Sequence, residues 1–93
     1  MPGQEYAETV GLKALAWLAG QEEMLGTFLA ASGIGPGALR SRAAEPEFLG
    51  SVLDHILSND GWVVGFCDAT GLPYDAPMSA RRALPGGAEV NWT

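Results

Sequence analysis

Hydrophobic residues recur every three or four positions along most of this chain, the spacing of one face of an α-helix. Residues 47–58 show it most clearly, because Phe48, Val52 and Ile56 fall on one face while Ser51 and Asp54 fall on the other. Glycine or proline interrupts the pattern at intervals, where helices typically end or begin. These breaks lie at Gly20, Gly33, 35–37, 45–46, Gly71 and 85–87, and Ser58-Asn59-Asp60 makes a further break that can cap the next helix. The pattern predicts an all-α fold, a single compact bundle of about six helices.

The run at residues 62–67 is ambiguous by itself, because short apolar runs containing valine also occur in strands. A repeat resolves the ambiguity. Residues 28–34 read Phe-Leu-Ala-Ala-Ser-Gly-Ile, and residues 66–72 read Phe-Cys-Asp-Ala-Thr-Gly-Leu. The first copy belongs to a helical pattern that ends at Gly33, so we expect the second to be a buried helix that ends at Gly71.

The similarity between the two halves extends beyond this stretch. At the same offset Val10 corresponds to Phe48 and Leu18 to Ile56, and Pro36–Arg40 aligns with 77–81 after a three-residue insertion. Each half therefore has a long helix, a helix that ends in glycine, and a short helix that begins with proline. We predict pseudo-repeats over about residues 6–43 and 46–84, with flexible tails at 1–3 and 88–93, and packing through the faces led by Phe28 and Phe66.

Several segments also resemble a known family. They are Ala14-Leu15-Ala16-Trp17-Leu18, Phe28-Leu29-Ala30 with Gly33-Ile34, Pro46-Glu47-Phe48-Leu49 with Val52-Leu53, Ala76-Pro77-Met78, and Arg82-Ala83-Leu84-Pro85-Gly86-Gly87. In order and spacing, roughly residues 5–87 resemble the small alphaproteobacterial proteins grouped as domain of unknown function 3572. The resemblance implies a small helical bacterial protein, and it implies no activity, cofactor or catalytic residue.

Composition and charge narrow the function classes. The chain has 93 residues, 47% of them hydrophobic and 17% charged, which is typical of one globular domain. No apolar run approaches the ~18 residues of a membrane span, and no signal peptide is evident, so we expect a cytoplasmic protein without a membrane association. Cys67 can form no internal disulfide, and with His55 alone it makes no zinc site, so we expect no metal and no cofactor. We expect Cys67 to be a buried, unreactive thiol.

The basic residues are few and paired. The net charge is −6, which disfavours nucleic acids, yet Arg40 and Arg42 form one close pair and Arg81 and Arg82 another. Arg40 and Arg81 hold equivalent places in the two halves and could together contact an anion or an acidic partner. The alternative, which we favour, is that these arginines pair with carboxylates on the protein's own surface.

Two local motifs suggest further functions. Gly33-Ile34-Gly35-Pro36 is similar to the turn of helix-hairpin-helix proteins, which binds a DNA phosphate, and Arg40 and Arg42 follow it. A glycine helix end followed by a proline-started helix explains the same residues without DNA. Ser51 and His55 have the four-residue spacing of a nucleophile and a base on one helix edge, but no orienting acid or oxyanion site is evident. We expect His55 to lie in solvent on a polar face.

Trp17 and Trp62 are candidates for the core or, where exposed, for interface anchors. The leading hypothesis is a non-enzymatic protein-interaction or adaptor module with an unknown protein partner. The alternative is a nucleic-acid-binding module that uses the Gly33–Pro36 turn with Arg40 and Arg42. A hydrolase built on Ser51 and His55 is a distant third. The sequence allows a monomer or a homodimer.

Overall fold

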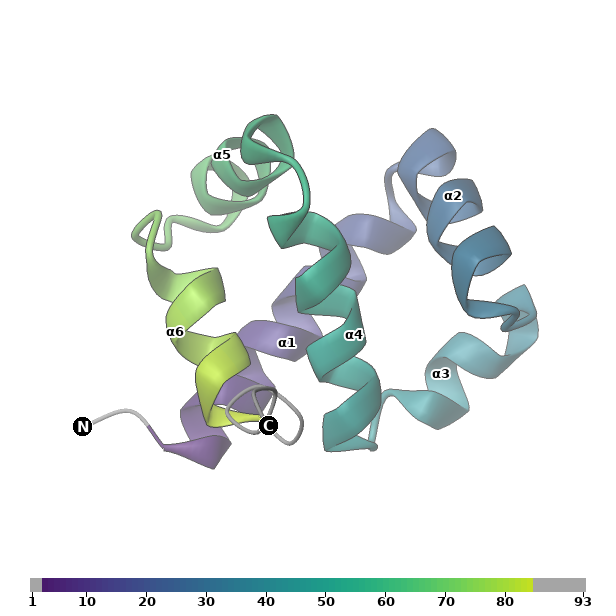
Figure 1. Cartoon of the computed structure of the whole chain (residues 1–93), viewed down its shortest axis with the longest axis horizontal. Helices are drawn as coiled ribbons and strands as arrows, with labels where there is room; N and C mark the ends of the chain where they lie inside the picture. The colour runs from purple at the N-terminus through teal and green to yellow at the C-terminus, as the bar shows by residue number, and fades with distance from the viewer. Residues whose placement is uncertain (1–2, 85–93) are drawn as a thin grey trace, which may run out of the picture.

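Two helices cross at the centre of the molecule and supply most of its core (Figure 1). The structure is a computed structural model, and it describes residues 3–84. The central helices are α1 (Gln4–Ala19) and α4 (Pro46–Leu57). Their apolar faces are fully packed, as the hydrophobic pattern predicts: the buried residues are Ala7, Val10, Gly11, Ala14, Leu15 and Leu18 on α1, and Phe48, Leu49, Gly50, Val52, Leu53 and Ile56 on α4.

The crossing of α1 and α4 is close because one of the two helices has no side chain at the contact. A Cβ atom added to Gly11 would lie 2.8 Å from the Cβ of Leu49, closer than real atoms approach. Gly11 therefore fixes the distance between the two central helices. These two residues are also 38 positions apart, so they are equivalent residues of the two predicted halves.

Helices α2 (Glu22–Ser32) and α5 (Asp60–Thr70) follow the central helices and have the same length. Each ends at a glycine in the left-handed region, Gly33 with φ 73° and Gly71 with φ 75°. The amide of each glycine donates to a carbonyl four residues earlier, as at an ordinary glycine helix end. The prediction that residues 62–67 are helical rather than a strand is confirmed.

The two halves pack through a pair of reciprocal ring contacts. Trp17 of the first half lies 5.8 Å from Phe66 of the second, measured between ring centroids. His55 of the second half lies 5.3 Å from Phe28 of the first. Trp17 and His55 are equivalent at the 38-residue offset, as are Phe28 and Phe66. A pseudo-twofold relation between the two predicted halves would produce contacts of this kind. Duplication of an ancestral half remains a prediction.

The short helices that end the halves are placed differently. Helix α6 (Ala76–Ala83) packs against both α1 and α4, whereas α3 (Leu39–Arg42), which follows η1 (Pro36–Ala38), has no fully buried residue. Helices α3 and α6 lie on opposite sides of α4 (Figure 1). Only one of the two short helices is therefore part of the central packing.

The predicted fold class is confirmed: the described residues form six α-helices around one core, without a strand. Among residues 3–84, no helix combines the length and the apolar character that crossing a membrane requires. The predicted tails fall almost wholly at residues 1–2 and 85–93, outside the described residues.

A candidate binding groove between the two halves

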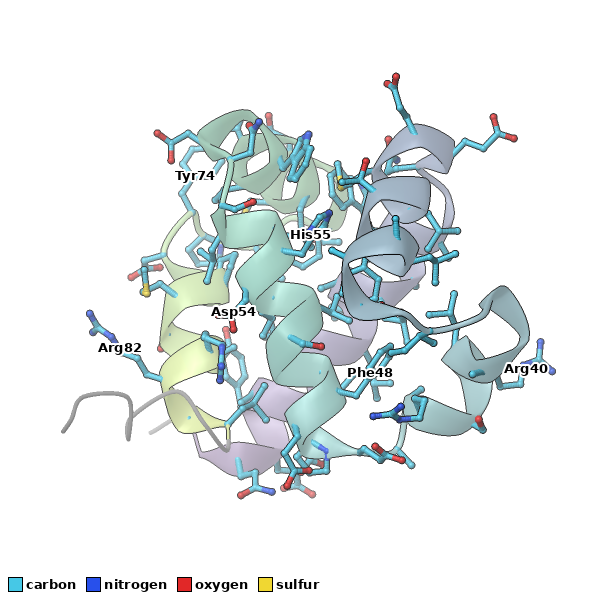
Figure 2. All side chains as sticks on the ribbon, turned by 45° about the vertical axis from the view of Figure 1, so that its right-hand side comes forward. Arg40, Phe48, Asp54, His55, Tyr74 and Arg82 are labelled. Carbon is cyan, nitrogen blue, oxygen red and sulfur yellow. The ribbon has the colours of Figure 1, made fainter. Side chains whose placement is uncertain are left out.

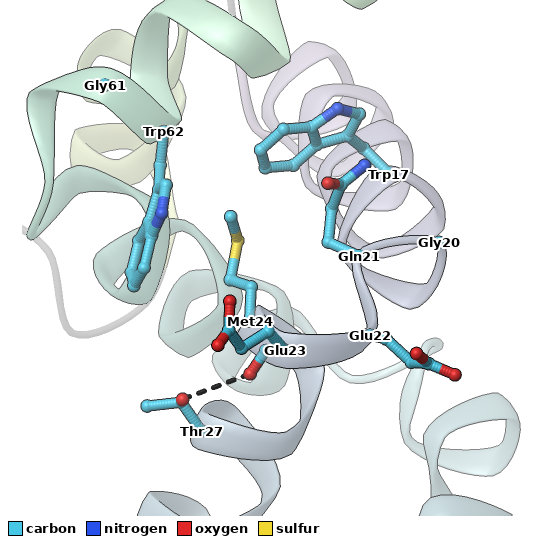
Figure 3. Close-up of a pocket in the computed structure, with 9 residues that line it drawn as sticks. All are labelled: Trp17, Gly20, Gln21, Glu22, Glu23, Met24, Thr27, Gly61 and Trp62. Atoms are coloured by element: carbon cyan, nitrogen blue, oxygen red, sulfur yellow. Dashed lines mark hydrogen bonds between the residues drawn. The ribbon is translucent and has the colours of Figure 1, made fainter.

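The first turns of α2 and α5 form an open groove with the end of α1. It has a volume of about 560 Å³, and each half contributes one wall (Figure 3). We call it the seam groove; its lining residues are Trp17, Gly20, Gln21, Glu22, Glu23, Met24, Thr27, Gly61 and Trp62. The structure thus brings Trp17 and Trp62, which the sequence suggested only singly, to one site.

Trp17 is held from behind by helix α5. Its ring is tilted by 58° against that of Phe66, and a Cβ added to Gly65 would lie 3.3 Å from its Cζ2 atom. The absence of a side chain at position 65 lets the indole lie close to the α5 backbone. Trp17 remains only partly buried, so the indole is both fixed and available to a ligand.

Trp62 is held by a helix cap and by His55. The side chain of Asn59 accepts a hydrogen bond from the Trp62 backbone N–H at 3.2 Å, which fixes the first turn of α5. The indole stacks on the imidazole of His55 with ring centroids 5.1 Å apart and planes at 33°. Both tryptophans are therefore supported by rings of the interior, Phe66 for one and His55 for the other.

The expectation that His55 lies in solvent is wrong. Its ring lies between Phe28 and Trp62 and is partly buried (Figure 2). Its Nε2 atom is buried and has no hydrogen-bond partner among the described residues. The helical pattern placed His55 at the edge of the polar face of α4, but it could not show that α2 and α5 close over that edge.

Two glutamates belong to the α2 wall of the seam groove. Glu22 and Glu23 lie in the first turn of α2, where the positive end of the helix favours carboxylates. The Glu23 carboxylate extends toward the space between Met24 and Trp62, whereas Glu22 points away from it (Figure 3). Within residues 3–84 no Lys or Arg forms an ion pair with either glutamate.

A second, shallower hollow lies between α2 and α4. It has a volume of about 390 Å³, and both Ser51 and His55 are among the residues that line it. The Ser51 hydroxyl donates to the carbonyl of Phe48 at 2.7 Å, an ordinary helix contact. The hydroxyl proton is therefore directed at the backbone rather than at the imidazole, and this arrangement does not favour a nucleophile.

The four arginines do not form one site. Arg81 donates to both carboxylate oxygens of Asp54, at 2.6 and 2.9 Å. Arg42 pairs with Glu45 at 2.8 Å and lies over the ring of Phe48. Arg40 and Arg82 are exposed at opposite ends of the molecule (Figure 2). Helix α4 lies between α3, which carries Arg40, and α6, which carries Arg81 (Figure 1), and a shared anion contact of these two arginines stays a prediction.

The Gly33–Pro36 turn leads into short helical pieces. Gly33 ends α2, and the turn continues into η1 and then α3, which is only four residues long. One of the two arginines that would contact a phosphate there, Arg42, is already bound to Glu45. The geometry is that of a glycine helix end followed by a short connector.

Cys67 is buried, and its thiol lies 3.3 Å from the carbonyl of Pro73. Burial raises the pKa of the Cys67 thiol above its ordinary value of 9.0, and the charges of Asp68 and Asp75 add to the effect. No cluster of three or more metal-ligating side chains occurs among residues 3–84. Cys67 therefore behaves as part of the core.

These observations define the class: a small all-α protein with an aromatic groove between the first turns of α2 and α5. The sequence model of the family described as protein of unknown function (DUF3572) matches residues 4–87. The chain belongs to this family, as its sequence resemblance implied. Comparison with curated proteins and with solved structures finds no match.

Sequence reasoning singled out the two tryptophans but missed the site that they share. The helical pattern gives no reason to single out Glu23, Met24 or Thr27. The repeat contained the missing signal, because the 38-residue offset pairs Met24 with Trp62. Equivalent residues near a pseudo-twofold axis face each other, so this pairing pointed to opposite walls of one groove.

Proposed function

We propose that this protein is a non-enzymatic protein-interaction module that binds a segment of its partner in the seam groove. The observation that carries the proposal is the presence of two partly buried tryptophans, one from each half, in a single open groove. Tryptophan is the residue type most enriched at the energetic centres of protein interfaces. Fixed indoles also lose little conformational entropy on binding.

The shape of the groove supports a protein ligand. About 560 Å³ with an open mouth accommodates one or two side chains of a segment that continues along the surface. Met24 forms part of the wall between the indoles, and methionine adapts its shape to different partners. An adaptor that binds short segments needs this combination of rigid and adaptable walls.

The proposal is tested with a photo-crosslinking residue introduced into the chain in the cells that produce it. Thr27 lines the groove and is exposed, and Ser79 is an exposed control on α6. We expect position 27 to crosslink to one identifiable protein, position 79 not to do so, and Trp62→Ala to abolish the product. Circular dichroism would verify that the variants fold. No product at position 27, or the same products at both positions, would refute the proposal.

Nucleic-acid binding through the Gly33–Pro36 turn is the alternative hypothesis. The net charge of −6, the four-residue α3 and the pairing of Arg42 with Glu45 all weigh against it. Titration with duplex and single-stranded DNA at about 50 mM salt tests it, because charge-driven affinity is greatest at low salt. We expect no binding, and binding that Arg40→Ala weakens would favour the alternative.

A further inference from the structure

The chemistry of the seam groove favours one kind of side chain. The Glu23 carboxylate extends toward the space beside Trp62, and no Lys or Arg within residues 3–84 neutralises it (Figure 3). The face of an indole carries partial negative charge and attracts cations more strongly than any other aromatic side chain. An aromatic wall and an unpaired carboxylate therefore present the same sign of potential to a ligand.

An anionic ligand would be repelled by the same groups. The first backbone N–H groups of α2 could bind an anion, because its N-cap residue, Gln21, makes no side-chain cap. However, Glu22 and Glu23 occupy the first turn and repel anions there. The net charge of −6 adds to this repulsion and attracts basic partners from a distance.

We propose that the seam groove binds a basic segment of the partner protein, and that an arginine of this segment stacks on the indole of Trp62 and pairs with Glu23. This inference rests on the proposed function and adds the chemistry of its partner. Arginine fits better than lysine because its planar guanidinium can stack on an indole while its N–H groups remain free to bind a carboxylate. Met24 and Trp17 then contact the aliphatic part of the arginine side chain.

Peptide binding to the purified chain tests the inference. The probe is the capped peptide Gly-Gly-Arg-Gly-Arg-Gly-Gly, and the control is the same peptide with citrulline, a neutral isostere, in place of arginine. The readout is the NMR signal of the Trp17 and Trp62 indole N–H groups. We expect saturable shifts of these signals with the arginine peptide, and affinity about tenfold lower with citrulline, since the cation–π and carboxylate contacts are both lost.

Matched charge variants localise the effect. Glu23→Gln should weaken binding of the arginine peptide about fivefold, whereas Glu47→Gln, an exposed position on α4, makes the same change in net charge and should have little effect. Equal binding of the two peptides would overturn the inference. So would equal effects of the two variants, or binding of inorganic phosphate in preference to the peptide.

The two proposals can fail separately. A crosslink from position 27 to a partner, together with no response to the arginine peptide, would refute the basic segment alone. If position 27 gives no crosslink in the otherwise unchanged chain, the proposed function is refuted, and the inference that rests on it is refuted as well.

Discussion

Helices α3 and α6 begin with similar sequence features but have different structural roles. Pro36 precedes α3 and Pro77 is the second residue of α6, and an arginine follows each proline one turn later. Yet α6 buries Ala76, Pro77 and Ala80, while α3 has no fully buried residue. The difference shows at the equivalent positions of the two helices. Ala80 is fully buried, whereas Leu39 is only partly buried against the core. A repeated pattern of caps thus predicts that a helix forms, but not where it packs.

The largest expected change in stability comes from introducing a charge at equivalent positions of α6 and α3. Ala80→Asp places a carboxylate at a position with 0% exposure and should lower the free energy of unfolding by at least ~3 kcal/mol. Leu39→Asp, at the equivalent and only partly buried position, should cost about 1 kcal/mol. Urea denaturation measures both. Similar losses in the two variants would mean that α3 packs as firmly as α6.

The second prediction compares glycines on the inner and outer helices. Gly11→Ala brings a methyl group against Leu49 and should destabilise the protein by about 1–2 kcal/mol, after allowing for the helix propensity of alanine. Gly26→Ala, on α2, meets open space and should stabilise it by about 0.5–1 kcal/mol. Thermal or urea denaturation should therefore show a lower free energy of unfolding for Gly11→Ala and a higher one for Gly26→Ala. Stabilisation by both substitutions would show that the crossing of α1 and α4 is less close than described.

The third prediction concerns the two ion pairs, one beside each short helix. Asp54→Asn removes a bidentate partner from Arg81, whose side chain is 16% exposed, and should cost about 1 kcal/mol. Glu45→Gln removes an exposed pair with Arg42 and should cost ~0.3 kcal/mol or less. Denaturation in low and high salt measures both effects. If Glu45→Gln lowered the free energy of unfolding more than Asp54→Asn, the ion pair beside α3 would be the stronger one, contrary to this prediction.

The smallest effect is a pH dependence in the α5–α6 region. The folded state raises the pKa of Cys67 through burial and that of Tyr74 through the hydrogen bond of its hydroxyl to Asp68. Both groups therefore favour folding below their ordinary pKa values, and this contribution is lost as the pH rises through the higher values of the folded state. Unfolding free energies measured above about pH 9 should decline less in Cys67→Ala than in the parent chain. A decline of the same size in both would contradict the role of the buried thiol.

The two halves also show what the sequence could and could not predict. Spacing and caps predicted the six helices, because both are local: Gly33 and Gly71 end helices wherever the chain goes afterwards. The partial burial of His55 depends on contacts with Phe28 of α2 and Trp62 of α5. The pattern of residues along α4 alone could not predict these contacts. The groove depended likewise on two helix starts meeting across the molecule. Trp17 and Trp62 could be recognised as candidates, but their proximity could not.

The contact between Gly11 and Leu49 has a consequence for the history of the chain. If the halves descend from identical copies, these two positions once held the same residue beside its own duplicate. Two glycines would leave a hole at the centre, and two leucines would collide. The present pair fits because one position is glycine and the other leucine. Residues 4–43 and 46–84 are therefore complementary at this contact, since the glycine of one makes room for the leucine of the other.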